Sequence, residues 1–231
     1  MTESSTERTS KIGVIDMKRG AIFDMDGTLV DTEKFYRKGW IEVADTFGYE
    51  RKPELAEAMS GAGSKRMPEI IHSFYPDADA EEYGRRVREI VRIESEKELK
   101  LMNGVKDILD YFKGQGVLMA VASSSRISRV EPTVKRAGIG DYFKIILGGD
   151  QITNGKPAPD IFLKAAEELD LTPTECYVFE DSINGVYAGC AAGCETIMVE
   201  DLTPPTDEIR KMCHVFDSMT TAMAAIKRGE I

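Results

Sequence analysis

Short apolar runs and longer amphipathic stretches alternate through the second half of the chain. After residue 104 their spacing predicts helices at 105–113, 126–137, 158–169 and 182–192, and strands at 117–122, 145–148, 177–180 and 195–199. A further buried strand is expected at 19–24. Strands that alternate regularly with helices are typical of a parallel sheet covered by helices. The pattern therefore predicts an α/β fold.

A different pattern occupies the region between the first strand and this alternating part. Residues 34–102 carry apolar positions at helical spacing, and no stretch of them has the pattern of a strand. We expect an all-helical domain inserted into a core that comprises residues 19–33 and 103–231. Residues 1–18 are rich in Ser, Thr, Glu and Lys, and we expect a loosely ordered N-terminal extension there.

Composition narrows the classes of function. The 231 residues are 42% hydrophobic and carry a formal net charge of −10, which argues against a nucleic acid or an anionic membrane as the main partner. Because no apolar run approaches the roughly 20 residues that span a bilayer, we expect a cytoplasmic protein. We also expect a monomer or a weak dimer. The cysteines lack the close spacing of a zinc site, and we expect reduced structural thiols at Cys176, Cys190, Cys194 and Cys213.

Two carboxylates follow the first expected strand. Asp24 and Asp26 share one face of an extended chain, and Gly27 permits a sharp turn directly after them. Carboxylates this close repel each other unless a cation such as Mg²⁺ lies between them or one is protonated. A metal-neutralised carboxylate can attack phosphorus while a neighbouring acid protonates the leaving group. A turn with two solvated acids is the alternative interpretation of so short a motif.

Polar residues also follow three later strands. Ser123 and Ser124 can hold phosphate oxygens, and Lys156 can offset the charge of an anionic nucleophile. Glu180 and Asp181 can complete an oxygen site for Mg²⁺. Each has a structural alternative, since serines and acids often cap helices and lysines are usually exposed. Because the carboxyl ends of parallel strands meet at one edge of a sheet, we expect these residues to form one site.

Four ordered motifs give the chain a resemblance to the haloacid dehalogenase superfamily. They are Asp-Met-Asp-Gly-Thr-Leu-Val at 24–30, Val-Ala-Ser-Ser-Ser at 121–125, Gly-Lys-Pro-Ala-Pro-Asp at 155–160 and Phe-Glu-Asp-Ser-Ile-Asn-Gly-Val at 179–186. The helical insertion resembles the cap of the branch that contains beta-phosphoglucomutase and many sugar-phosphate phosphatases. The resemblance implies a Rossmann-like parallel sheet core with an inserted all-helical cap domain, an aspartyl-phosphate intermediate and a requirement for Mg²⁺.

The resemblance also implies roles for individual residues. Asp24 would be the nucleophile and Asp26 the general acid/base, while the phosphate would be bound by Ser123 and Lys156, with Ser124 beside them. The metal ligands would be Asp24, the backbone carbonyl of Asp26, and Asp181, with Glu180 as a further candidate. Members that act on carbon–halogen or phosphonate bonds lack an acid at the position of Asp26, so we reject those two reactions.

The expected cap contains candidates for substrate selection. The loop at 60–66 resembles the cap loop that faces the active site in this branch, where Lys65 or Arg66 could grip a second phosphate or a sugar. A solvated loop is the alternative. Phe35, Tyr36 and Trp40 have a spacing typical of core packing.

Hydrolysis and mutase chemistry use the same core motifs. Counting from the nucleophile, Tyr36 occupies the position at which beta-phosphoglucomutases have a histidine that couples cap closure to acid/base chemistry. This departure favours a Mg²⁺-dependent phosphatase acting on a small phosphorylated metabolite, preferably a sugar phosphate, with beta-phosphoglucomutase as the alternative. A catalytically idle binding module is a third hypothesis, against which the acids at 24, 26 and 181 argue.

Overall fold

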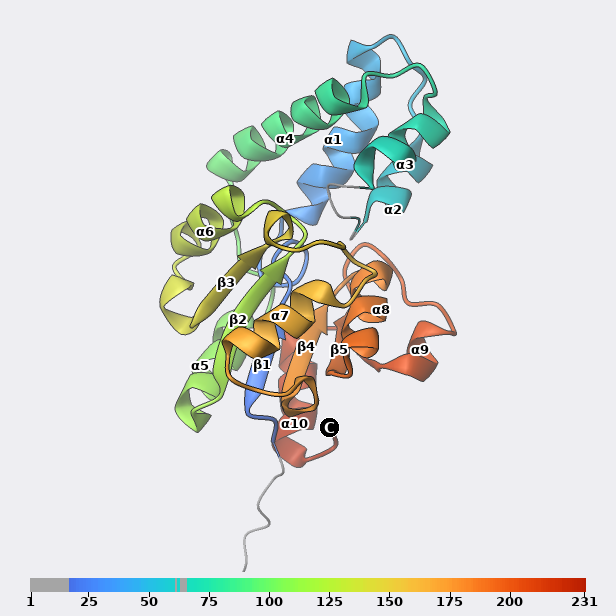
Figure 1. Cartoon of the computed structure of the whole chain (residues 1–231). Coiled ribbons are helices and arrows are strands. Elements are labelled where there is room, and N and C mark those ends of the chain that lie inside the picture. The colour runs from blue at the N-terminus through green and yellow to red at the C-terminus, as the bar shows by residue number, and fades with distance from the viewer. Residues whose placement is uncertain (1–16, 61, 63–65) are drawn as a thin grey trace, which may run out of the picture.

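The structure is a computed structural model that describes residues 17–60, 62 and 66–231. Within these residues a sheet of six parallel strands has the order β3-β2-β1-β4-β5-β6 (Figure 1). The strands are β1 (Gly20–Phe23), β2 (Leu118–Ser123), β3 (Ile145–Gly148), β4 (Cys176–Glu180), β5 (Glu195–Val199) and β6 (His214–Phe216). The predicted α/β fold is confirmed.

Strand β1 lies in the middle of the sheet, and its four residues are buried. Phe23 pairs with Val121 of β2 and with Phe179 of β4, so these three strands end at nearly the same level. The residues that directly follow them therefore lie side by side at the carboxyl edge, where open α/β sheets bind their ligands.

Strand side chains alternate between two apolar layers, one on each face of the sheet. Phe23 and Phe179 point to one face, where their rings stack with centroids 4.6 Å apart. Ile22 and Val178 point to the opposite face. The first face is covered by α5 (Val105–Gln115), α6 (Ile127–Arg136) and α10 (Met219–Arg228), and the second by α7 (Asp160–Glu168) and α8 (Ile183–Ala192).

Shorter elements complete the core. The four-residue helix α9 (Ile209–Met212) packs beside α8 through Ile209. Single 3-10 turns occur at η1 (Gly140–Tyr142), η2 (Gly149–Gln151) and η3 (Pro173–Glu175).

The helical insertion forms a separate apolar core beyond the carboxyl edge of the sheet (Figure 1). It consists of α1 (Glu33–Thr46), α2 (Pro53–Met59), α3 (Met67–Phe74) and α4 (Ala80–Lys97), which we call the cap. Helices α1 and α4 pack along each other, and the buried Tyr83 hydroxyl of α4 donates a 2.8 Å hydrogen bond to the Trp40 carbonyl of α1. None of the helices in the described residues combines the length and the apolar character needed to cross a membrane.

The chain passes between core and cap on two adjacent segments. The N–H of Asp31 donates to the carbonyl of Lys100 at 3.0 Å, and Val30 forms an antiparallel bridge with Leu101. We propose that the cap lies between these two crossings, close to the expected range of 34–102, although its first helix already begins at Glu33.

Candidate active site

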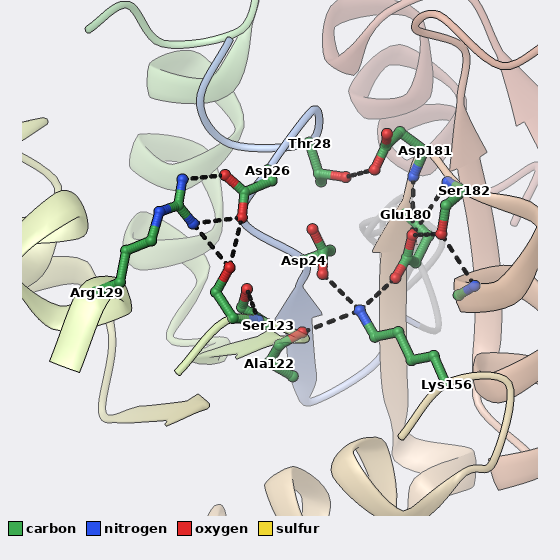
Figure 2. Close-up of polar contacts among 12 residues, drawn as sticks. Asp24, Asp26, Thr28, Ala122, Ser123, Arg129, Lys156, Glu180, Asp181 and Ser182 are labelled. Carbon is green, nitrogen blue, oxygen red and sulfur yellow. Dashed lines mark hydrogen bonds and ion pairs between the residues drawn. The ribbon is translucent and has the colours of Figure 1, made fainter. Parts of the chain in front are cut away.

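A buried lysine joins β1 and β4 at the carboxyl edge of the sheet (Figure 2). The Nζ of Lys156 donates to Oδ1 of Asp24 at 2.5 Å and to Oε1 of Glu180 at 2.5 Å. It also donates to the carbonyl of Ala122 at 3.2 Å. The lysine side chain is only 1% exposed, so these acceptors replace the water that a charged ammonium requires. They hold the positive charge against one oxygen of Asp24.

Both oxygens of Glu180 are engaged. Its Oε1 accepts from Lys156, and its Oε2 accepts from the backbone N–H groups of Asp181 and Ser182, each at 3.1 Å, and from the Ser182 hydroxyl at 3.0 Å. A Cβ atom at Gly185 would lie 1.8 Å from the Glu180 carboxyl carbon, so the glycine leaves the room that this side chain occupies. Glu180, a candidate metal ligand on sequence grounds, is therefore arranged to orient Lys156 and the start of α8.

Asp181 lies across the Gly27 turn that follows β1. Its Oδ1 accepts a 3.0 Å hydrogen bond from the hydroxyl of Thr28. A Cβ atom at Gly27 would lie 2.3 Å from Oδ2 of Asp181, and Gly27 has a φ of +79°. Glycine at this turn therefore satisfies both the left-handed backbone and the close approach of the carboxylate.

Negative charge exceeds positive charge in this buried region, where Asp24, Glu180 and Asp181 surround the ammonium of Lys156. Burial raises the pKa of Asp24 to about 7, and the charges of Glu180 and Asp26 also raise it. Burial and the charge of Glu180 likewise hold the pKa of Asp181 well above its usual range. A divalent cation shared by Asp24 and Asp181 would balance this excess charge.

The available oxygen donors fit Mg²⁺. They are the carboxylates of Asp24 and Asp181 together with the backbone carbonyl of Asp26. Mg²⁺ usually keeps several water molecules and takes only one or two protein carboxylates. No cluster of three or more His, Cys, Asp or Glu side chains suited to a metal occurs in the part of the chain that the structure describes.

Two serines present hydroxyl groups beside Asp24. The Oγ of Ser123, the last residue of β2, accepts from the N–H of Ser125 at 3.1 Å, so its proton is available to a ligand. The Oγ of Ser124 is buried and has no hydrogen-bond partner among the described residues. A buried hydroxyl without a partner costs free energy, and a phosphate oxygen would satisfy it.

Asp26 points away from Asp24 and toward an arginine that the sequence analysis did not select (Figure 2). Arg129 of α6 donates from Nη1 to Oδ2 at 2.7 Å and from Nη2 to Oδ1 at 2.6 Å. The hydroxyls of Thr32 and Ser125 donate to the same carboxylate. Burial opposes ionisation, but Arg129 outweighs it and lowers the pKa of Asp26. The spacing in the sequence could have identified Arg129, because it lies four residues after Ser125 and close to the expected serine site.

A cavity of about 810 Å³ lies between the cap and this edge of the sheet. Its core side is lined by Asp24, Asp26, Ser123, Ser124, Ser125, Arg126, Ser128, Arg129, Gly149, Asp150, Asp181 and Ser182. Its cap side is lined by Glu33, Tyr36, Trp40, Met59, Ala62, Met67, Pro68, Glu81 and Arg88. Five of the residues selected at the strand ends therefore meet at one space, whereas Lys156 and Glu180 are buried and do not line it.

The cap candidates are placed differently from one another. Arg66 is exposed at the start of α3 and is not part of the cavity lining, and Lys65 lies outside the described residues. Phe35 and Trp40 are buried in the cap core, although Trp40 also reaches the cavity. Tyr36 faces the cavity, and its ring centroid lies 5.1 Å from the guanidinium carbon of Arg129.

Glu33 brings a further acid to the cavity from the first residue of α1. Burial raises its pKa to about 8, and the charges of Asp26 and Asp201 add to that effect. Glu33 was not predicted from the sequence as a site residue, since an acid at a helix start is explained by the helix dipole alone.

A family model described as haloacid dehalogenase-like hydrolase matches residues 21–199. The chain is 33% identical over 177 residues to a phosphorylated carbohydrates phosphatase of Thermotoga maritima, covering 76% of this chain and 82% of that protein. It is 35% identical over 184 residues to a fructose-1-phosphate phosphatase of Escherichia coli, covering 78% of this chain and 95% of that protein.

A similar solved structure is CbbY from Rhodobacter sphaeroides in complex with phosphate. It has a TM-score of 0.76 and 27% identity, and the match covers 91% of this chain and 100% of that chain. A putative beta-phosphoglucomutase from Thermotoga maritima has a TM-score of 0.70 and 28% identity, covering 91% of this chain and 99% of that one. The likeness extends over both the sheet and the cap.

Proposed function

The chain belongs to the haloacid dehalogenase-like hydrolases, and on that premise we propose that it is a Mg²⁺-dependent phosphatase of a small phosphorylated metabolite. The observation that carries this proposal is the buried contact of Lys156 with Asp24 and Glu180 beside the Ser123 and Ser124 hydroxyls. This arrangement presents one carboxylate to an incoming phosphoryl group and supplies positive charge and hydroxyl donors for its oxygens.

In the proposed reaction the free oxygen of Asp24 attacks phosphorus and forms an aspartyl phosphate. Lys156 reduces the repulsion between the carboxylate and the anionic phosphoryl group, and the serines bind its oxygens. In its protonated form Asp26 donates a proton to the leaving oxygen as the bond between that oxygen and phosphorus breaks. The carboxylate that results then takes a proton from the water that hydrolyses the intermediate and releases Asp24.

Mg²⁺ would be held by Asp24, Asp181 and the backbone carbonyl of Asp26. When bound, it supplies charge neutralisation to the acids and to the phosphoryl oxygens. We omit Glu180 from the proposed ligands because both of its oxygens are engaged with Lys156 and the start of α8.

A sugar phosphate is the proposed substrate. The similar proteins of Thermotoga maritima and Escherichia coli are named for phosphorylated carbohydrates and for fructose 1-phosphate. A cavity of about 810 Å³ lies within the usual range for small-molecule sites, and its hydroxyl, acidic and basic groups suit a polar molecule such as a sugar phosphate. We propose that the enzyme acts on this small molecule in the cytoplasm, as a monomer or weak dimer.

Tyr36 favours hydrolysis over the beta-phosphoglucomutase alternative. Its position is the one at which the mutase histidine is expected, and burial raises the pKa of the Tyr36 phenol. A neutral phenol packed on Arg129 does not supply the titratable group that a histidine brings to cap closure.

A panel of sugar phosphates incubated with Mg²⁺ tests the proposal through the release of inorganic phosphate. We expect release from at least one sugar phosphate. Conversion of beta-glucose 1-phosphate to glucose 6-phosphate without free phosphate would instead identify a mutase. The absence of any turnover across the panel would favour a binding module.

A further inference from the structure

The carboxylate of Asp26 has four donors on its two oxygens. Thr32 and Arg129 donate to Oδ1, and Ser125 at 3.2 Å and Arg129 at 2.7 Å donate to Oδ2. An ionised carboxylate offers about four lone-pair positions, so this set occupies all of them. In this arrangement Asp26 has no oxygen position left with which to serve a leaving group. Figure 2 shows the same carboxylate turned toward α6 and away from Asp24.

Arg129 is the strongest of these restraints, because two parallel bonds to a carboxylate are both charge-assisted and geometrically specific. Its guanidinium is also fixed by a 2.8 Å bond to the Ser125 hydroxyl and by the Tyr36 ring of the cap. It is not sealed from the cavity, since its side chain is 24% exposed and it forms part of the lining. A group inside the cavity can therefore reach it.

Two further guanidinium groups line the same space. Arg126 comes from the loop before α6 and Arg88 from the cap helix α4. Burial and the nearby charge of Arg126 both lower the pKa of Arg88, and neither arginine has a carboxylate ion pair within residues 17–60, 62 and 66–231. Glu81 and Asp150 also line the cavity, and the charge of Glu81 acts on Arg88. Because neither carboxylate forms an ion pair with these arginines, the two guanidinium groups can attract an anion to this side of the cavity.

We propose that Arg129 is a positioning residue that keeps Asp26 turned away from the leaving group until a second anionic group of the substrate draws the guanidinium to itself. This inference rests on the proposed function and narrows it to phosphorylated metabolites that carry a second phosphate or carboxylate. The same planar fork that binds the Asp26 carboxylate is complementary to either anion, so one contact is exchanged for another. Asp26, held then only by Thr32 and Ser125, becomes free to turn toward the leaving oxygen.

A matched pair of substrates tests the exchange: fructose 1-phosphate and fructose 1,6-bisphosphate, with initial rates of phosphate release for the wild type and for Arg129→Gln. For the variant we expect kcat to rise on the monophosphate. In the wild type this substrate has no second anion to replace Asp26 on Arg129, and in the variant the ion pair that Asp26 would have to break is absent. We expect the preference in kcat/KM for the bisphosphate to fall about tenfold, the factor typical of a charge-assisted hydrogen bond. Arg129→Lys, which keeps the charge but not the fork, should shift both quantities in the same directions.

Arg92→Gln is the matched control, since it removes one positive charge from the exposed face of α4, where Arg92 pairs with Glu89 and Glu96. It should leave both substrates unaffected. A parallel loss of both activities in Arg129→Gln, or no change in either, would overturn the proposal. An unchanged monophosphate kcat with a reduced bisphosphate preference would also overturn it, because Arg129 would then only bind anions.

The exchange of Asp26 for the second anion on Arg129 can also be observed without turnover. In crystals of Asp24→Asn containing fructose 1,6-bisphosphate, the Arg129 guanidinium should contact the second phosphate and the Asp26 pair should be open. An intact pair beside a bound bisphosphate would contradict the exchange. If the wild type released no phosphate from any sugar phosphate of the panel, the proposed function would fail, whereas release with an unchanged preference in Arg129→Gln removes only the role given to Arg129.

Discussion

The Nζ of Lys156 lies 2.5 Å from Oε1 of Glu180, and both side chains are 1% exposed. The two residues come from different segments, the loop before α7 and the end of β4, and neither contacts bulk water to any extent. Because an isolated buried charge is strongly unfavourable, each of them is needed to accommodate the other. Lys156 also donates to Oδ1 of Asp24, so the pair holds Asp24 in position for the proposed attack on phosphorus.

Replacement of Lys156 by Ala should slow phosphoryl transfer. The carboxylates of Asp24 and Glu180 would face each other without the ammonium, and the phosphoryl group would lose a preorganised charge. A loss of about 2 to 4 kcal/mol of transition-state stabilisation is expected. Steady-state kinetics measure it, with Lys164→Ala as the control, since Lys164 forms a loose surface pair with Glu168 at 3.7 Å. Equal kinetics in the two variants would remove Lys156 from the mechanism.

Gly185→Ala should impair both stability and turnover. The added Cβ would lie 1.8 Å from the carboxyl carbon of Glu180, so Glu180 must move and its contact with Lys156 must change. Overpacking of this kind typically costs about 1 to 3 kcal/mol in the free energy of unfolding. Gly114→Ala on α5 is the control, because nothing lies within 4 Å of its added Cβ. Urea unfolding that finds the two variants equally stable would contradict the tight packing at Gly185.

Mg²⁺ should stabilise the folded protein. A cation that binds only the folded state stabilises it by an amount that grows with the logarithm of the cation concentration above the dissociation constant, and Tm rises accordingly. We expect Mg²⁺ to raise the Tm of the chelator-treated protein and Asp181→Asn to abolish most of that increase. Asp77→Asn, in an exposed turn of the cap, should respond as the wild type does. An Asp181→Asn protein with an undiminished increase in Tm would show that Asp181 is not a ligand.

Much of the core and its site could be predicted from the sequence because the signals are local. Strands β3 and β5 have the expected bounds, and the acids and serines directly after the strands follow from strand periodicity and the carboxyl-edge rule. The elements after residue 199 were not predicted. Strand β6 has only three residues, all half-buried, so it lacks an apolar run of detectable length.

The contacts between separate segments could not be predicted in the same way. The pairing of Arg129 with Asp26 joins residues 103 positions apart, and the arginine could equally have been a solvated residue of α6. Glu180 was expected at this site as a candidate metal ligand. The sequence does not show that Lys156 and the start of α8 use both of its oxygens. Lys65, expected to bind substrate, lies outside the described residues and stays a prediction.

The most direct test concerns Asp24 as the group that accepts the phosphoryl moiety. Phosphate release from the best sugar phosphate of the panel should be measured for Asp24→Asn with Mg²⁺, alongside Asp31→Asn, whose carboxylate pairs with Lys34 instead. An amide of nearly the same size cannot attack phosphorus, so we expect Asp24→Asn to fold normally and to release no phosphate above background, while Asp31→Asn stays active. Near-native release by Asp24→Asn would contradict the mechanism.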